Sequence, residues 1–251
     1  MLSVLVPTIR PQNLPRLYES IEKSYSGEWE LILCGPYYPP KEIQEKKNVI
    51  FIQSWRSPAA AQQTALLFAT GKLLTWGADD GIFLPKMLDE AITYYSSKKD
   101  INTILSCMYK EGGGENMQST NYYKITSAPA MRALYIKPES IVINVGILST
   151  TLVKVLGGWD SQLESASIAH QDFAVRAANF GCNIELFPFQ IFECSHLKEE
   201  LGDHGPVHRS HIKNEKVFRE IYSKPESVYR FKIDLYNCFH TDSVWKERFN
   251  G

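Results

Sequence analysis

Two adjacent carboxylates follow an apolar run in the stretch LLTWGADDGIFLP, residues 73–85. Because Asp79 and Asp80 repel each other, the pair suits either a solvated turn, which Asp-Gly favours, or a site where a cation lies between the carboxylates and a ligand. Mg²⁺ and Mn²⁺ prefer hard oxygen ligands, and Mg²⁺ usually binds through one or two carboxylates together with substrate phosphates. The pair is therefore a candidate for contacting a metal ion and a nucleotide.

A second acidic candidate lies in SIAHQDFAVRAANFG, residues 167–181, which has the pattern of a helix ended by Gly181. Asp172 and Arg176 are four positions apart and could form an ordinary surface ion pair, worth about 0.2–0.5 kcal/mol. Asp172 could instead take a proton from an acceptor hydroxyl, and His170 is a rival for that role. The spacing leaves these interpretations open.

A third group, in ECSHLKEELGDHGPVHRSH, residues 193–211, combines a cysteine with several histidines at a spacing that matches no common zinc site. One of them could complete a metal site begun by Asp80. Taken singly, each histidine is better explained as a surface residue of a loop or helix. The members are Cys194, His196, His204, His208 and His211.

Strands and helices alternate along the first 100 residues, which predicts a mostly parallel sheet with helices on both faces. Ligands bind such sheets beyond the carboxyl ends of the strands. Four pairs are expected there: Pro7-Thr8, Cys34-Gly35, Arg56-Ser57 and Asp79-Asp80. The sequence has neither GxGxxG after the first strand nor a P-loop, so phosphate recognition would rely on a metal and on basic side chains, with Arg10 and Arg56 as candidates.

The second half mixes its elements. Strands are predicted at residues 102–110, 132–138 and 182–196, and amphipathic helices at 207–222 and 228–239. The glycine-rich residues 111–120 and the region after His196 are candidate lids. We expect one domain over 1–251, with a nucleotide-binding half to about residue 100 and an acceptor-binding half, including the C-terminal helices, after it.

The composition narrows the class of protein. A net charge of −1 gives no general attraction to nucleic acid, and no apolar run approaches the roughly 20 residues of a membrane span. The five cysteines are widely spaced, and the first residues do not have the pattern of a signal peptide. These features predict free thiols and a cytoplasmic protein without a transmembrane segment.

The order of these features resembles glycosyltransferase family 2, which has the GT-A fold, over residues 2–196. Three segments carry the resemblance: LSVLVPTIRPQNLPRLYESI, SPAAAQQTALLFATGKLLTWGADDGIFLP with its DxD-like end, and GGWD followed by HQDFAVRA. The resemblance implies an inverting, metal-dependent transfer of a sugar from a UDP-, GDP- or dTDP-linked donor to a hydroxyl of a glycan or glycoconjugate. Mn²⁺ or Mg²⁺ is the implied cofactor.

The resemblance also implies roles for residues. Asp172 is expected as the base, with His170 second, and Asp80 with His196 as metal ligands. Asp79 is expected at the ribose. The implied nucleotide-binding residues are Pro7, Thr8, Arg10, Cys34, Gly35, Arg56, Ala60 and Asp79.

Departures from the family pattern keep another function class open. Gly77 replaces the first aspartate of the DxD motif, and Gln62-Gln63 stand where Arg-Asn is common. The alternative is a non-catalytic module that binds nucleotide sugars or glycans on the same fold. A nucleotidyltransferase is disfavoured, because PTIRPQN after the first strand contains no glycine.

Overall fold

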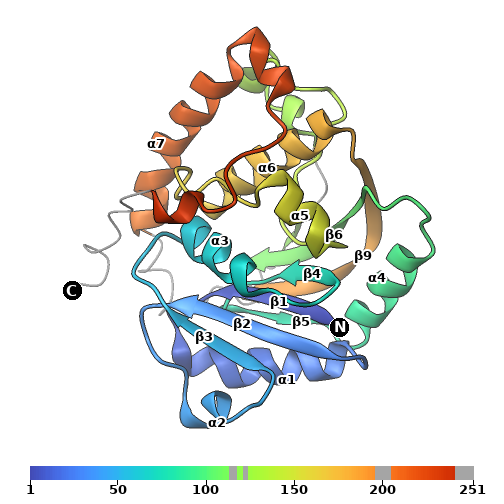
Figure 1. Cartoon of the computed structure of the whole chain (residues 1–251), viewed down its shortest axis with the longest axis vertical. Helices are drawn as coiled ribbons and strands as arrows, with labels where there is room; N and C mark the ends of the chain where they lie inside the picture. Colours follow the sequence, from blue (N-terminus) through green and yellow to red (C-terminus); the bar gives the residue numbers. More distant parts are fainter. Residues whose placement is uncertain (113–117, 121–123, 196–204, 241–251) are drawn as a thin grey trace.

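A computed structural model of the chain describes residues 1–112, 118–120, 124–195 and 205–240. Within them, helices cover both faces of one nine-stranded sheet (Figure 1), whose order is β3-β2-β1-β4-β8-β6-β9-β5 with β7 paired to β6. The strands are β1 Leu2–Pro7, β2 Trp29–Gly35, β3 Val49–Gln53, β4 Leu73–Trp76, β5 Gly81–Phe83, β6 Thr103–Gly112, β7 Gln118–Thr120, β8 Gly146–Ser149 and β9 Asn183–Ser195. The α-helices are α1 Leu14–Ser24, α2 Lys41–Gln44, α3 Pro58–Phe68, α4 Met87–Ser96, α5 Thr150–Leu156, α6 Ala166–Phe180 and α7 Gly205–Tyr222.

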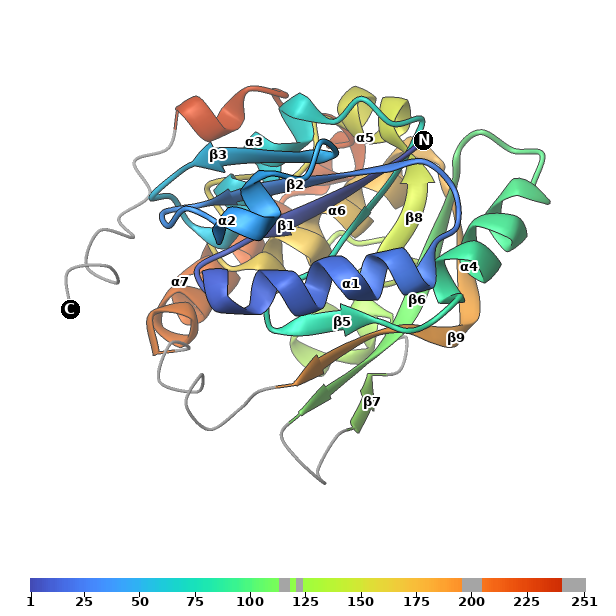
Figure 2. The ribbon, with the colours of Figure 1, turned by 90° about the horizontal axis from the view of Figure 1, so that it is seen from below.

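The first half is parallel, as predicted. Strands β1, β2, β3 and β4 pair in parallel, so their carboxyl ends meet at one edge. Side chains alternate between the two faces of β1: Val4 and Val6 join the core cluster that holds α1 and α4, whereas Leu5 joins the cluster that holds α3, α5 and α6. Figure 2 shows α1 lying along one face of the sheet.

The second half is mixed, also as predicted. β8 runs antiparallel to both β4 and β6, and β9 runs parallel to β6. The short strand β5 pairs antiparallel with β9, so that Gly81 lies opposite Cys194. A Cβ at Gly81 would lie 2.1 Å from the ring of Phe192, so this pairing requires glycine. The pairing brings the double aspartate next to β9.

Two predicted elements are wrong. Residues 132–138 form turns instead of a strand, and residues 228–239 form extended chain and short 3₁₀ turns instead of a helix. Side chains hold the second segment in place: Asn179 donates to the carbonyls of Ser227 and Arg230, both at 3.0 Å, and Arg230 pairs with Asp160 at 2.6 Å. These tertiary bonds outweigh the helical pattern. No helix in the part of the chain that the structure describes is long and apolar enough to cross a bilayer.

Candidate active site

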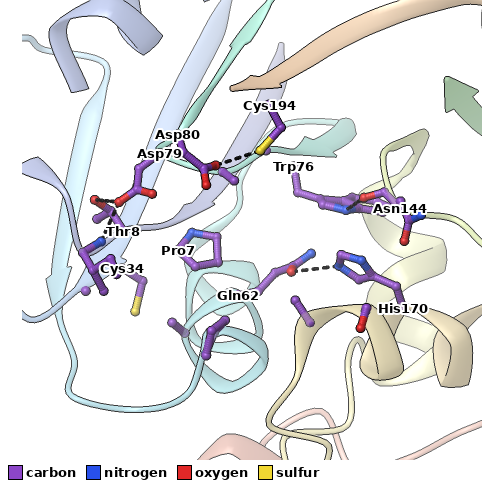
Figure 3. A pocket seen from close by; sticks show the side chains of 18 of the residues that line it. Pro7, Thr8, Cys34, Gln62, Trp76, Asp79, Asp80, Asn144, His170 and Cys194 are labelled. Atoms are coloured by element: carbon purple, nitrogen blue, oxygen red, sulfur yellow. Dashed lines mark hydrogen bonds between the residues drawn. The ribbon is translucent and has the colours of Figure 1, made fainter. Parts of the chain in front are cut away.

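A cavity of about 600 Å³ opens beyond the carboxyl ends of β1, β2 and β4 (Figure 3). Thr8 and Cys34 lie at one end of the view, His170 and Asn144 at the other, and Gln62 between them. The cavity brings together most of the residues singled out from the sequence. Those that line it are Pro7, Thr8, Arg10, Cys34, Gly35, Arg56, Asp79, Asp80, His170, Cys194 and His211.

The tips of β1 and β2 are in unusually close contact at the Thr8 end of the cavity. A Cβ on Gly35 would lie 1.7 Å from the carbonyl oxygen of Thr8, so only glycine allows this approach. The thiol of Cys34, on the same strand end, has its pKa raised to about 12 by burial. Cys34 is therefore a neutral wall residue at pH 7.

Asp79 ties the loop after β1 to the end of β4. Its Oδ2 accepts from the backbone N–H of Ile9 and of Arg10, both at 2.7 Å, and from Thr8 Oγ1 at 3.1 Å. Its Oδ1 accepts from Arg10 Nη1 at 2.7 Å. Burial raises the pKa of Asp79, although Arg10 opposes that shift. Three donors crowd Oδ2, whereas Oδ1 accepts only from Arg10 among the described residues and keeps one acceptor position. The ribose contact of Asp79 stays a prediction.

Asp80 lies between Arg10 and β9. Its Oδ2 is 3.5 Å from Arg10 Nη1, and its Oδ1 accepts from the Sγ of Cys194 at 3.0 Å. Burial, together with the Asp80 carboxylate, raises the pKa of Cys194 well above its ordinary value. Arg10 thus places its guanidinium beside both carboxylates, at the corner where the sequence predicts a metal cation between the carboxylates and a ligand.

His170 forms part of the far wall of the cavity. Its Nε2 lies 3.1 Å from Gln62 Oε1, and its ring centroid lies 5.6 Å from that of Trp76. Burial lowers the pKa of His170 from 6.5 to about 3. The imidazole is therefore neutral at pH 7.

This buried histidine makes stability depend on pH. The unfolded chain protonates His170 below about 6.5, whereas the folded chain resists protonation until about 3. The free energy of unfolding should therefore fall as the pH drops from 6.5 towards 3, because the unfolded state binds the extra proton. Urea unfolding of wild type and His170→Asn at about pH 7 and about pH 5 tests this, and wild type should lose more stability. Equal losses would contradict a neutral, buried His170.

Asp172 does not lie in the cavity. It is fully buried, its Oδ2 accepts from Arg176 Nε at 2.7 Å, and its Oδ1 accepts from the hydroxyl of Tyr222 at 2.7 Å. Burial alone would raise the pKa of Asp172, but Arg176 and Arg230 lower it below its usual value. The role of base predicted for Asp172 does not suit this placement, since both oxygens face partners in the core.

Two other predicted residues do not reach the cavity either. Ala60 is buried in the first turn of α3, where its N–H donates to Ser57 Oγ at 3.3 Å, and Ala61 lines the cavity instead. His196 lies outside the described residues, as do the candidate lid after it and residues 113–117 of the other candidate lid. The metal role of His196 stays a prediction.

Some wall residues were not singled out as site residues from the sequence. Trp76 donates from Nε1 to the carbonyl of Asn144 at 2.6 Å, which fixes the indole beside the cavity. Glu111, which accepts from the hydroxyl of Tyr109 at 3.0 Å, comes from the end of β6. Only tertiary pairing brings these residues to β1, so no local pattern marks them.

No protein-family model and no curated protein matches the sequence. Solved structures do match. Residues 1–349 of S. aureus TarS in complex with UDP align with a TM-score of 0.57 and 17% identity, over 100% of this chain and 73% of that one. The UDP-GlcNAc complex of the same TarS segment aligns with a TM-score of 0.56 and 14% identity, over 87% of this chain and 70% of that one. GalNAc-T7 with UDP, GalNAc and Mn²⁺ aligns with a TM-score of 0.61 and 13% identity, over 90% of this chain and 51% of that one.

The chain has the GT-A fold. The prediction of that fold from the sequence is confirmed, including its parallel first half and mixed second half. At these identities the likeness establishes the fold, and TarS and GalNAc-T7 are themselves glycosyltransferases. In this GT-A fold the cavity lies at the carboxyl ends of β1, β2 and β4, where the open parallel sheets of α/β proteins bind their ligands.

Proposed function

We propose that the chain transfers a sugar from a nucleotide diphosphate sugar to an acceptor hydroxyl, with inversion at the anomeric carbon. The proposal depends on one observation. In this GT-A fold, the carboxyl ends of β1 and β2 line the same cavity as Arg10 and His170. The TarS and GalNAc-T7 complexes contain UDP, and one contains UDP-GlcNAc, which makes a UDP sugar the first donor to test before GDP- and dTDP-linked sugars. The acceptor class, a glycan or glycoconjugate, and the cytoplasmic location stay predictions.

The donor would lie along the length of the cavity. The base fits against Pro7, Thr8, Cys34 and Gly35, where the two strand tips meet. The diphosphate fits near the guanidinium groups of Arg10 and Arg56, which can form charge-assisted hydrogen bonds to phosphate. The sugar then extends towards Gln62, Trp76 and His170. Arg10 is held by Asp79, so its charge is fixed in place before the leaving diphosphate gains negative charge.

His170 is the proposed proton acceptor. With Gln62 Oε1 facing Nε2, that nitrogen carries the proton, and Nδ1 is the basic nitrogen. A base whose pKa is about 3 is weak towards a neutral alcohol. The acceptor hydroxyl becomes strongly acidic as its oxygen bonds to the anomeric carbon, so the transfer to His170 would come late in the reaction.

The described residues do not form a metal centre of their own. No group of three potential ligands occurs among them, and Arg10 pairs with Asp79 and lies against Asp80. The GalNAc-T7 complex contains Mn²⁺, so divalent metals are used by at least one protein of this fold. The Asp80 and His196 site for Mn²⁺ or Mg²⁺ stays a prediction, and no step above depends on it.

Release of nucleotide from a panel of donors tests the function. Wild type should release UDP from at least one UDP sugar, slowly with water and faster with an acceptor, measured with Mn²⁺ and with EDTA. Binding of a nucleotide sugar without any release would instead support the non-catalytic module. If UDP is released with Mn²⁺ but not with EDTA, the reaction requires a divalent metal.

A further inference from the structure

Helix α3 carries two adjacent glutamines that differ in their hydrogen bonding. Gln63 is fully buried and its amide is fully used. Its Oε1 accepts from the N–H of Trp159 at 2.7 Å, and its Nε2 donates to the carbonyls of Gly157 at 2.9 Å and Leu235 at 2.7 Å. Gln63 therefore holds the loop before α6 and the C-terminal segment together.

Gln62 is equally enclosed, but half of its amide is unused. Its side chain lines the cavity and the residue is 2% exposed. Oε1 lies 3.1 Å from His170 Nε2, whereas Nε2 has no hydrogen-bond partner within the described ranges. Buried donors are nearly always bonded, and an unpaired one destabilises the protein. A native donor left in this state at a cavity wall points to a ligand group.

The surroundings of Gln62 indicate what that group is. The indole of Trp76 lies next to the His170 ring, and Trp159 packs behind it at 5.1 Å between ring centroids. Trp76 lines the cavity, and its apolar ring suits contact with the C–H groups of a sugar. The amide of Gln62 is a neutral donor beside aromatic rings, which suits an uncharged oxygen such as a sugar hydroxyl.

We propose that Gln62 Nε2 donates a hydrogen bond to a hydroxyl oxygen of the transferred sugar, which makes Gln62 a residue that determines donor specificity. The inference rests on the proposed function, because it places the sugar between the diphosphate end of the cavity and His170. The same amide would join the sugar to His170 through its Oε1, so sugar binding and the orientation of the imidazole are linked at one side chain.

Two substitutions separate the roles of the amide. Gln62→Glu keeps the oxygen that faces His170 and removes the NH₂ donor, whereas Gln62→Leu removes both with little change in volume. Calorimetric titration of each variant with UDP, UDP-GlcNAc and its C4 epimer UDP-GalNAc supplies the readout. Both variants should bind the preferred UDP sugar roughly 3- to 10-fold more weakly and should bind UDP as wild type does. The ratio of affinities for the two epimers should move towards one.

Gln63→Leu is the matched control. It removes three bonds inside the protein, so it should lower the melting temperature more than Gln62→Leu, which removes only the bond to His170. Unchanged binding of the UDP sugar in both Gln62 variants would overturn the inference, and so would a rise confined to the KM of the acceptor. If wild type binds UDP but no nucleotide sugar, the proposed function fails, and the sugar contact fails with it.

Discussion

Replacing His170 by alanine is expected to lower the rate of glycosyl transfer by roughly 10²-fold, the lower end of the usual contribution of a positioned base, because an imidazole whose pKa is about 3 is a weak base. The binding of UDP should change little, because the nucleotide end of the cavity, at Thr8 and Cys34, lies at the opposite end from His170 in Figure 3. Initial rates with a saturating UDP sugar give kcat, and titration with UDP gives the affinity. The expected loss is therefore confined to kcat.

His211 is the matched control for this prediction. It is a second histidine at the cavity, placed by α7 beside Ser165 and Ser167. His211→Ala should change kcat far less than His170→Ala. If the larger loss fell on His211, the proton acceptor would be misassigned, while the donor site would remain as proposed.

Asp172→Ala should destabilise the fold by about 3–5 kcal/mol, because it leaves the charge of a fully buried arginine without its carboxylate partner. Arg176 is 0% exposed and also donates to the carbonyls of Leu156 and Gly158, so it cannot turn towards water. Tyr222 would lose its acceptor as well. Denaturant unfolding measures the loss, and kcat per folded molecule should be unchanged.

Asp160→Asn provides the comparison. Asp160 pairs with Arg230, whose side chain is 25% exposed, so water can replace part of the lost interaction and the loss of stability should be smaller. A stable Asp172→Ala protein that binds UDP but does not turn over would contradict the structural role. It would return Asp172 to the position of base.

Much of the first half of the fold follows from local patterns. Ser57 and Pro58 mark the start of α3, and the Ser57 hydroxyl does accept from the N–H of Ala60. Strands β1 to β4 are apolar runs that need no tertiary information. β5 has three residues and β8 has four, which is too short for a periodic signal, and the helical pattern of residues 228–239 is overridden by Asn179 and Asp160.

The site was predictable where it depends on strand ends and not where it depends on helix faces. Residues two apart on a helix are separated by about 200°, so His170 and Asp172 cannot both face one cavity. The sequence pairs Asp172 with Arg176 but does not say that this face is the buried one. The contact of Cys194 with Asp80 joins residues 114 positions apart, and only the pairing of β5 with β9 creates it.

A crystal structure of the wild-type chain with UDP-GlcNAc tests the central claim most directly. We expect the uracil against Thr8 and Cys34, the diphosphate in contact with Arg10, and the sugar within hydrogen-bond reach of Gln62 Nε2 and beside His170. A nucleotide bound outside this cavity, or a sugar that points away from His170 into solvent, would contradict it.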